Sequence, residues 1–389
     1  MEKHMAKRTA TNNYLCQAIA RACDVIETFQ APGEHLRLTD IAERTKLSAS
    51  TVFRILYTLE QRGLVVRVGE RQYQLNIRPP KRRKHHIGFA GQSQEFAFSR
   101  AVAESLTEAA AKADVDLLVL DNQYSAKTAL RNADVFIREQ VELVIEFQTD
   151  EHVAPVISSK LIEANIPMIA VEIPHPGATY YGANNYSAGL LGGHMLGRWA
   201  KHHWKEAVDE VLLLELSIAG SLPQARLTGT LSGIRDVIPG LEDSRVFRLE
   251  SKGQFGPTLE VVRRHLRHSR AKRVLIAGIN DPSALGALSA MEEAGRGETC
   301  AIMGQNASLE ARNELRKRSS RLIGSVAYFP ELYGDALTSL AIDILAKKPT
   351  PPAVFVKHQM VTKENVERFY PNDALLEHGE LEGQLFWAR

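Results

Sequence analysis

The sequence predicts an α/β protein of two parts: a small N-terminal domain of three helices and a β-hairpin, and a larger body with two doubly wound parallel β-sheets. Three features of the 389 residues support this prediction. Residues 1–76 combine helical periodicity with two short extended stretches. Residues 77–86 form a basic linker that contains two prolines. In residues 87–389, short apolar strands alternate with amphipathic helices in two successive rounds.

The composition is that of a globular protein, with 44% hydrophobic and 24% charged residues. No stretch approaches the roughly 18 consecutive apolar residues of a membrane span, and the charged N-terminus lacks the apolar core of a signal peptide. Cys16, Cys23 and Cys300 lack metal-ligand spacing and fit a reducing compartment. We therefore expect a cytoplasmic protein without membrane segment, metal or cofactor, in which Cys16 and Cys23 pack in a core.

Charge is distributed unevenly along the chain. Residues 1–86 contain 16 Lys and Arg against 8 Asp and Glu, a net charge of +8, whereas residues 87–389 contain 32 against 38, a net charge of −6. A basic head suits a polyanion partner, and an acidic body limits nonspecific adhesion to it. A merely solvated surface could show the same asymmetry, so charge alone does not identify the partner.

The N-terminal domain begins with an amphipathic helix that ends at Ala31-Pro32-Gly33. Thr39 is predicted to cap a short second helix. Ser48 is predicted to cap a third helix over residues 49–62, which Gly63 ends. Two extended stretches at residues 64–68 and 71–75, joined by Gly69-Glu70, then predict a hairpin. This order of elements is that of a winged helix-turn-helix.

The outward face of the third helix carries polar side chains of the types that bond phosphates and base edges. Arg54 is the candidate for a base contact, because bidentate arginine–guanine pairing is the commonest specific contact. Arg67 and Arg71 on the wing are candidates for phosphate contacts. Alternatively, these side chains are ordinary solvated surface residues that do not contact DNA. The candidate DNA-contacting residues are Thr39, Ser48, Ser50, Thr51, Arg54, Tyr57, Arg67 and Arg71.

Residues 38–65, LTDIAERTKLSASTVFRILYTLEQRGLV, resemble the IclR-type winged helix, and Tyr73-Gln74-Leu75 matches the end of that family's wing. The resemblance spans about residues 12–76. It implies a dimeric domain that recognises a pseudo-palindromic operator in double-stranded DNA. The chain after the wing does not resemble the usual IclR effector domain.

The linker at residues 77–86 contains Pro79-Pro80 and a basic run that ends in His85-His86. The prolines disfavour helix and stiffen the chain. The basic run is either a solvated spacer or a contact to the DNA backbone, and the sequence does not decide between them.

The body contains the strand–helix alternation of two doubly wound lobes, in which ligands bind beyond the carboxyl ends of the strands. Amphipathic helices, for example at residues 98–113 and 126–139, separate the strands. The predicted strands are residues 87–90, 117–120, 143–147, 168–171 and 180–183 in the first round, and 211–216, 246–249, 274–278, 301–304 and 322–327 in the second.

Three motifs of the body resemble the type 1 periplasmic-binding-protein fold of LacI-type regulators and sugar-binding proteins. They are GANNYSAG at residues 182–189, GINDPSALGAL at residues 278–288 and VTKENV at residues 361–366. The resemblance covers about residues 86–365 and implies crossings between lobes near Asn184, Tyr328 and Pro351. The first lobe would comprise residues 87–183 and 329–350, and the second residues 184–328 and 351–365.

Carrying over the family's sugar contacts gives a set of polar and aromatic candidates. Carboxylates and amides pair with hydroxyls, and aromatic rings face the apolar side of a pyranose. Each Phe could instead be core packing. Ile173, Asn306 and Tyr328 depart from the family's usual residues, so the particular sugar is not predicted and a non-sugar effector stays open. The candidates are Gln94, Phe96, Phe98, Gln148, Thr149, Asp150, Glu172, Arg226, Lys252, Phe255, Asn280, Asp281, Asn306 and Tyr328.

These features predict a homodimeric, cytoplasmic, DNA-binding transcription regulator whose operator affinity depends on a small polar ligand, a sugar or sugar derivative. An enzyme is not expected, because the chain has no Gly-x-Ser-x-Gly, no P-loop and no metal-spaced Cys/His cluster. His265 and His268 share a helical face that we interpret as a solvated basic surface. Two alternatives remain. One is a sugar-responsive solute-binding protein that does not read DNA, and the other is an enzyme that acts on a small sugar.

Overall fold

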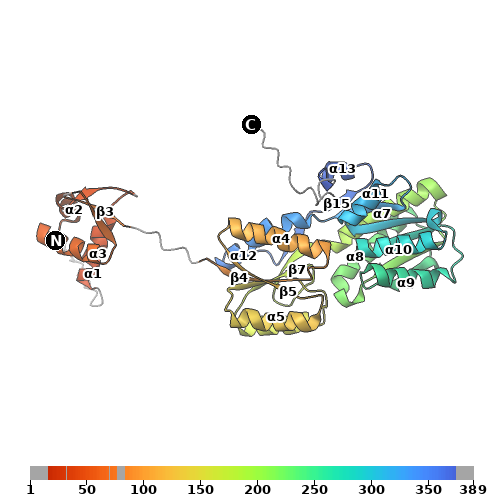
Figure 1. Cartoon of the computed structure of the whole chain (residues 1–389), viewed down its shortest axis with the longest axis horizontal. Coiled ribbons are helices and arrows are strands. Elements are labelled where there is room, and N and C mark those ends of the chain that lie inside the picture. Colours follow the sequence, from red (N-terminus) through yellow and green to blue (C-terminus); the bar gives the residue numbers. More distant parts are fainter. Residues whose placement is uncertain (1–15, 32, 70, 77–83, 374–389) are drawn as a thin grey trace, which may run out of the picture. The chain divides into compact units, whose positions relative to one another are not determined.

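A computed structural model describes residues 16–31, 33–69, 71–76 and 84–373 (Figure 1). The chain divides into two compact units, residues 1–83 and residues 84–389, and each is described by itself. Most of the predicted linker, residues 77–83, lies outside the described residues, as do residues 1–15 of the predicted N-terminal domain.

The first unit is a three-helix domain with a small antiparallel sheet of strand order β1-β3-β2. Its core contains Val25, Ile41, Leu56 and Val65, one from each helix and one from the hairpin. Its elements are α1 (Gln17–Glu27), β1 (Leu36–Arg37), α2 (Leu38–Thr45), α3 (Ala49–Gln61), β2 (Val65–Val68) and β3 (Gln72–Leu75).

Helix α3 begins at Ala49 as predicted and ends at Gln61, one residue before the predicted end. The Ser48 hydroxyl accepts a hydrogen bond from the Thr51 backbone N–H at 3.3 Å, which caps the first turn. Gly63 has φ +70°, a conformation that glycine adopts without strain. The N–H of Leu64 donates to the carbonyl of Leu59 at 2.8 Å and closes the helix end.

Two predictions about the first unit are wrong. Thr39 does not cap α2, because the helix begins at Leu38, and Arg37 in the cap position donates its backbone N–H to Asp40 at 2.9 Å. Cys16 and Cys23 do not pack in a core, since both are exposed. They lie at the start and on the surface of α1, where only Val25 is buried.

The first lobe of the second unit is built on a parallel six-stranded sheet of order β14-β8-β7-β6-β4-β5. Helices α4 (Ala97–Lys112) and α12 (Tyr333–Leu345) cover one face, and α5 (Ala126–Arg138) and α6 (Ala154–Glu163) cover the other (Figure 1). The strands are β4 (His86–Gly91), β5 (Asp116–Asp121), β6 (Leu143–Glu146), β7 (Met168–Val171), β8 (Thr179–Ala183) and β14 (Ala353–Val356).

The second lobe has a six-stranded sheet of order β10-β9-β11-β12-β13-β15, parallel except for β15. Helices α7 and α8 cover one face, and α9, α10 and α11 cover the other. The elements are α7 (Asn185–Trp204), β9 (Glu210–Glu215), α8 (Ser221–Val237), β10 (Val246–Glu250), α9 (Phe255–Leu266), β11 (Val274–Gly278), α10 (Asp281–Glu293), β12 (Cys300–Asn306), α11 (Leu309–Arg316), β13 (Leu322–Ala327), β15 (Gln359–Val361) and α13 (Val366–Phe369).

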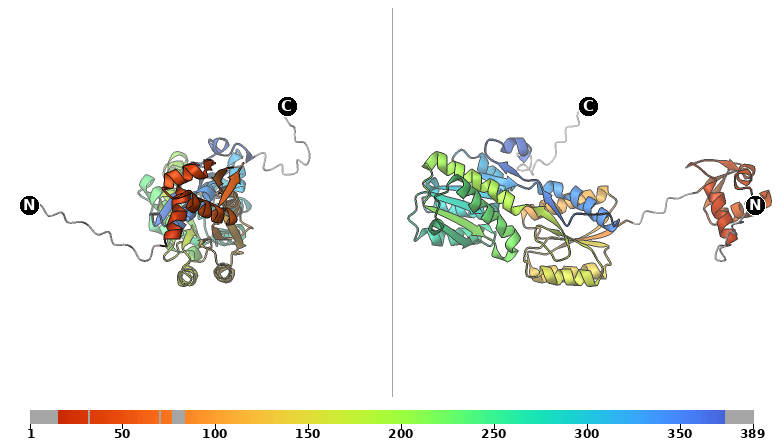
Figure 2. Two further views of the ribbon diagram at one scale, coloured as in Figure 1. Left: turned by 90° about the vertical axis from the view of Figure 1, so that its left-hand side faces the viewer. Right: turned by 180° about the vertical axis from the view of Figure 1, so that it is seen from behind.

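The chain passes between the lobes three times (Figure 2). The first two crossings follow β8 and β13, near Asn184 and Tyr328 as expected. The third was expected near Pro351 but lies between β14 and β15, at residues 357–358. Strand β14 extends the first sheet by pairing with β8, so residues 353–356 belong to the first lobe rather than the second.

Helices α7 and α8 approach one another closely through small residues. A Cβ atom at Gly189 would collide with the Arg226 carbonyl, and one at Gly193 with the Thr230 carbonyl. Gly229 on α8 leaves equivalent space for the backbone of α7. This packing fixes the position of α8 and therefore of Arg226, which points toward the space between the lobes.

None of the helices among the described residues is long and apolar enough to cross a membrane.

Candidate functional site

A cavity of about 350 Å³ lies between the two lobes, beyond the carboxyl ends of the strands of both sheets. This volume is within the range of small-molecule sites. Nine of the candidate ligand residues line it. They are Phe96, Phe98, Thr149, Glu172, Arg226, Phe255, Asn280, Asn306 and Tyr328.

Three candidates that follow strands are outside the lining because their polar groups hold the loops together. Gln148 is buried and its amide oxygen accepts the N–H of Asp150 at 2.6 Å. Asp281 is fully buried and accepts hydrogen bonds from the Ser308 N–H and the Ser325 hydroxyl, both at 2.6 Å. These predictions of ligand contact by Gln148, Asp150 and Asp281 are not supported by the geometry.

The remaining two candidates, Gln94 and Lys252, are also outside the lining. The carbonyl of Gln94 accepts from the Arg100 guanidinium at 2.9 Å, and its side chain is exposed. Lys252 is exposed in a left-handed turn of φ +55°, and its N–H donates to Glu250 at 2.8 Å. Both residues lie in turns that follow strand ends, where position alone does not direct a side chain inward.

Arg226 is held in the cavity wall by several hydrogen bonds. Its Nε and Nη2 atoms donate to Oδ1 of Asn185 at 3.0 and 2.7 Å, and Nη1 donates to the carbonyl of Ile279 at 2.6 Å. Arginine has five N–H donors, so these three bonds leave two for a ligand. The guanidinium also lies over the Tyr328 ring, 5.0 Å from its centroid.

Glu172 of the first lobe faces the same cavity. It has φ +62°, and its Oε1 atom accepts the Tyr333 hydroxyl at 2.7 Å. Burial raises the pKa of Glu172 above its ordinary value, and the nearby Arg226 partly opposes this increase. The carboxyl group of Glu172 and the guanidinium of Arg226 therefore come from opposite lobes and line the same cavity.

Aromatic rings form much of the cavity wall. Phe96 and Tyr124 meet edge to face with ring centroids 5.0 Å apart, and Phe98 and Phe147 do so at 6.2 Å. Tyr124 also reaches across the cleft, where its hydroxyl donates to the carbonyl of Lys252 at 3.4 Å. Such rings suit the apolar face of a cyclic polyol.

Sequence reasoning missed several lining residues. The polar and aromatic ones are Gln92, Glu95, Tyr124, Phe147, Ser308 and Glu310. Tyr124 follows the end of β5, so the rule that ligands lie beyond strand ends could have identified it. Glu95 and Glu310 precede or begin helices, and no comparable sequence signal marks them.

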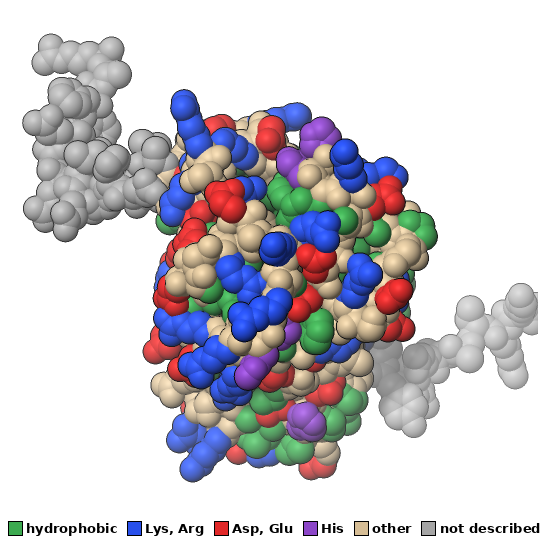
Figure 3. Space-filling view, turned by 90° about the vertical axis from the view of Figure 1, so that its right-hand side faces the viewer, with side chains coloured by type: hydrophobic (Ala, Val, Ile, Leu, Met, Phe, Trp, Pro, Cys, Tyr) green, Lys and Arg blue, Asp and Glu red, His purple; other side chains and the backbone are tan. Residues whose placement is uncertain are grey.

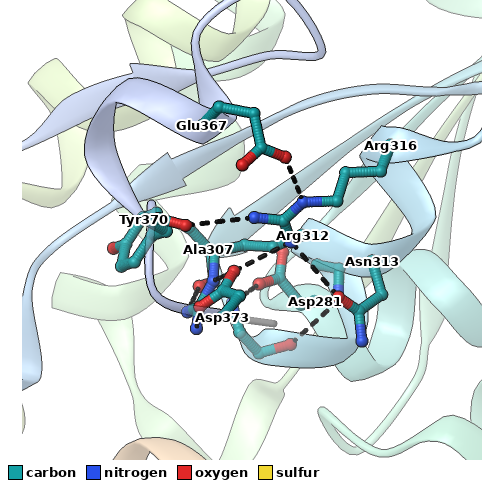
Figure 4. A network of polar contacts seen from close by, with 10 residues as sticks. Asp281, Ala307, Arg312, Asn313, Arg316, Glu367, Tyr370 and Asp373 are labelled. Atoms are coloured by element: carbon teal, nitrogen blue, oxygen red, sulfur yellow. Dashed lines mark hydrogen bonds and ion pairs between the residues drawn. The ribbon is translucent and has the colours of Figure 1, made fainter. Parts of the chain in front are cut away.

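The loop that carries Asn306 is braced by the C-terminal segment (Figure 4). Asn306 and Ala307 have φ values of +102° and +50°. Arg312 on α11 donates to the Ala307 carbonyl at 2.6 Å and pairs with Asp373 at 2.7 Å. Its guanidinium lies 3.9 Å from the centroid of the Tyr370 ring. These contacts hold the backbone of the loop at the cavity edge.

The exposed face of α3 presents the predicted DNA-contacting side chains. Ser50, Arg54 and Tyr57 are exposed and Thr51 is half-buried. Ser48 is exposed, and its hydroxyl is occupied in capping the helix. Phe53, which sequence reasoning did not select, is 48% exposed, and its ring centroid lies 6.4 Å from that of Tyr57.

A hollow lies between α3 and the wing. Thr39, Arg67 and Arg71 line it together with Phe53 and Arg37. The Arg67 guanidinium donates to the Tyr73 hydroxyl at 3.0 Å, which orients it on the wing. Three guanidinium groups in one hollow favour phosphate contacts.

His265 differs from its prediction, since it is not simply solvated. Its Nε2 atom lies 2.8 Å from a carboxylate oxygen of Glu210, and both side chains are 14% exposed. Arg263 pairs with Glu293, and His268 is exposed. Figure 3 views the molecule from the side of the second lobe, where Lys and Arg side chains are interspersed with Asp and Glu. Among the described residues, no group of three or more His, Cys, Asp or Glu could hold a metal ion.

Comparison with protein families gives two matches. The periplasmic binding protein domain matches residues 87–349, and the IclR helix-turn-helix domain matches residues 18–69. They confirm the predicted IclR-type helix-turn-helix and the predicted periplasmic-binding-protein domain, whereas the likeness to LacI-type regulators stays a prediction. A comparison with curated proteins finds no match.

Solved structures similar to this chain include solute-binding proteins. A periplasmic solute binding protein of an ABC transporter from Actinobacillus succinogenes 130z, with bound D-allose, is 17% identical, with a TM-score of 0.63 over 73% of this chain and 100% of that chain. The Caulobacter myo-inositol binding protein bound to myo-inositol is 21% identical, with a TM-score of 0.63 over 74% and 96%. A Mycobacterium smegmatis protein in complex with β-D-fucofuranose is 21% identical, with a TM-score of 0.61 over 75% and 97%. These likenesses confirm the two-lobed fold.

Proposed function

The chain belongs to the family of periplasmic binding protein domains and joins that domain to an IclR helix-turn-helix domain, and we propose that it is a transcription regulator whose DNA binding is controlled by a sugar or polyol. The observation that carries this proposal is a cavity with walls from two lobes in a chain that also has an exposed recognition helix. The similar proteins with bound D-allose and myo-inositol support a polyol as the ligand.

The mechanism follows from where the cavity lies. Glu172 and Thr149 come from the first lobe, whereas Arg226 and Asn280 come from the second, so a ligand that contacts all four favours the closed arrangement. A ligand shifts such an equilibrium only by its differential affinity for the two arrangements. Closure is therefore the event that alters operator affinity.

The active species is a homodimer in the cytoplasm. The IclR helix-turn-helix match supports a second copy, because helix-turn-helix dimers bind two half-sites one helical turn apart. Ile19 on α1 is 64% exposed, Cys16 and Cys23 lie near it along the helix, and none of the described residues buries these three side chains, which supports α1 as the contact surface for that copy. Three unpaired cysteines fit a reducing compartment.

The protein acts by binding rather than by catalysis, since both matched families are defined by binding domains. A thermal-shift screen of neutral sugars and polyols on the full chain, followed by selection of bound sequences from random duplex DNA, tests both halves of the proposal. We expect at least one polyol to raise the Tm and a pseudo-palindromic duplex to be enriched. A protein that binds a polyol but enriches no duplex would be a solute-binding protein, and the regulator proposal would be wrong.

A further inference from the structure

The cavity has more negative than positive charge. Its lining contains the carboxylates of Glu95, Glu172 and Glu310 and a single guanidinium, that of Arg226. The two exposed carboxylates, Glu95 and Glu310, alone outnumber the guanidinium, and Glu172, whose pKa burial raises, adds to this excess when it is ionised. Asp281, which is buried near the same edge, adds a further carboxyl, and Glu310 influences its ionisation.

The charge of Arg226 is already matched within the protein. The guanidinium donates to Asn185 and to the carbonyl of Ile279, lies over the Tyr328 ring, and interacts electrostatically with Glu172. An anionic ligand would compete with Glu172 for this one cation. Arg226 therefore provides hydrogen bonds to hydroxyl groups but little net positive charge.

Glu95 and Glu310 are not matched in the same way. Both are exposed at the cavity, and neither forms an ion pair within the part of the chain that the structure describes. Glu95 precedes α4 of the first lobe, and Glu310 lies in the first turn of α11 of the second lobe. Like charges on opposing lobes oppose closure, and a cation placed between them would remove that repulsion.

The aromatic wall suits a cation as well. Phe96, Tyr124 and Phe255 line the cavity, and Phe255 is 44% exposed. Ammonium groups are attracted to aromatic ring faces as well as to carboxylates. An amine on a polyol would thus meet two kinds of favourable group, while its hydroxyls pair with Asn280 and Arg226.

We propose that the cavity selects a polyol that carries a protonated amine, such as an amino sugar or an aminocyclitol, over its neutral parent, and that it rejects uronic acids and sugar phosphates. Glu95 and Glu310 are the specificity-determining residues. The inference rests on the proposed function, which gives a polyol as the ligand, and adds that this polyol carries a positive charge.

Matched probe series test the proposal on the full chain at low salt. Glucose, glucosamine, N-acetylglucosamine, glucuronate and glucose 6-phosphate form one series, and the galactose and mannose counterparts form two more. By calorimetry, we expect at least one of the three amino sugars to bind about tenfold more tightly than its neutral parent and its N-acetyl derivative. The uronic acids and the sugar phosphates should not bind.

The double variant Glu95→Gln/Glu310→Gln should reduce the preference for the amino sugar over its neutral parent to about twofold or less. Glu108→Gln, at an exposed position on α4 outside the cavity, is the matched control and should retain it.

Each outcome is informative. Equal or tighter binding of a neutral parent, an acid or a phosphate would overturn the amine selectivity. It would leave the proposed regulator intact, because a polyol would still bind. If the double variant keeps the preference for the amino sugar, Glu95 and Glu310 do not determine this selectivity. A panel in which nothing binds would contradict both the selectivity and the polyol ligand.

Discussion

The guanidinium of Arg226 lies over the Tyr328 ring, with 5.0 Å between its central carbon and the ring centroid. Arg226 is carried by α8 of the second lobe, and Tyr328 follows β13 where the chain crosses to the first lobe. The Tyr328 hydroxyl in turn donates to the amide oxygen of Gln305 at 2.5 Å. A ligand that moves Arg226 therefore acts directly on one of the segments that connect the lobes.

Replacing Arg226 with Lys should abolish the ligand-induced Tm increase. Lysine keeps the charge but cannot bond Asn185 Oδ1 with two nitrogens or stack on Tyr328 as a planar group. The free protein should lose about 2–4 kcal/mol of unfolding free energy, because a buried hydrogen-bonded charge is disturbed. Operator affinity without ligand should stay within twofold. An undiminished Tm increase with ligand would exclude Arg226 from the site.

Replacing Gly193 with Ala should displace α8 and weaken ligand binding. The added Cβ would collide with the Thr230 carbonyl, and overpacking of this kind costs about 1–3 kcal/mol. Urea unfolding and calorimetry measure the two effects. Gly240→Ala is the control, because no atom lies within 4 Å of its added Cβ. Equal stability of the two variants would show that α7 and α8 are not in close contact.

Replacing Glu146 with Gln should flatten the pH dependence of stability. Glu146 is fully buried, and burial raises its pKa from 4.5 to about 8. Between these values the folded protein keeps a proton that the unfolded chain has released. The free energy of unfolding is therefore highest below pH 4.5 and falls as the pH rises through 8, by at most about 5 kcal/mol.

Unfolding free energies of wild type and Glu146→Gln between pH 5 and 9 measure this effect. As the pH rises, the free energy of unfolding of the wild type should fall relative to that of the Gln variant. Glu139→Gln, at an exposed position after α5, should follow the wild-type curve. Parallel curves for wild type and Glu146→Gln would show that Glu146 is not protonated in the folded protein at neutral pH.

Replacing Arg54 with Ala should weaken operator binding by about 1–3 kcal/mol and relax the sequence preference at one base pair of each half-site. Arg54 is exposed on the outward face of α3. Arg62→Ala, in the C-cap position of the same helix, removes the same charge away from the expected groove. Fluorescence anisotropy with the selected duplex should show a much smaller loss for Arg62→Ala. Equal losses would mean that Arg54 contributes charge but no base contact.

Replacing Ile19 with Glu should separate the dimer. The side chain is 64% exposed on α1, and a carboxylate there would have to be desolvated in an interface. Sedimentation should show a monomer, and the half-sites should be bound without cooperativity. Phe247→Glu, a similar change on exposed β10 of the second unit, should remain dimeric. A dimer that persists in Ile19→Glu would place the interface elsewhere.

Much of the fold could be predicted because its signals are local. Helix α3 has an N-cap at Ser48 and a glycine stop at Gly63, and both are properties of a few adjacent residues. The strands of both sheets are short apolar runs bounded by helices. The third crossing was misplaced because β14 is an edge strand, and its pairing with β8 depends on a partner distant in sequence.

The site could be predicted only in part for a similar reason. Glu172, Arg226 and Tyr328 lie at strand ends or on a helix whose family counterparts bind sugars, and they do line the cavity. Asp281 also follows a strand, but its carboxylate bonds to the neighbouring loop. Glu95 lies in the loop between β4 and α4, and no local sequence pattern distinguishes it from the neighbouring Gln94, which does not line the cavity.

The most direct test of the account is the linkage between the cavity and the DNA. The affinity of the full chain for its selected duplex should be measured by anisotropy across a titration of the tightest-binding polyol. We expect a change of about 5–150-fold in operator Kd and, by reciprocity, the same factor in ligand Kd when DNA is bound. A ligand that saturates the cavity while operator affinity stays constant would contradict it.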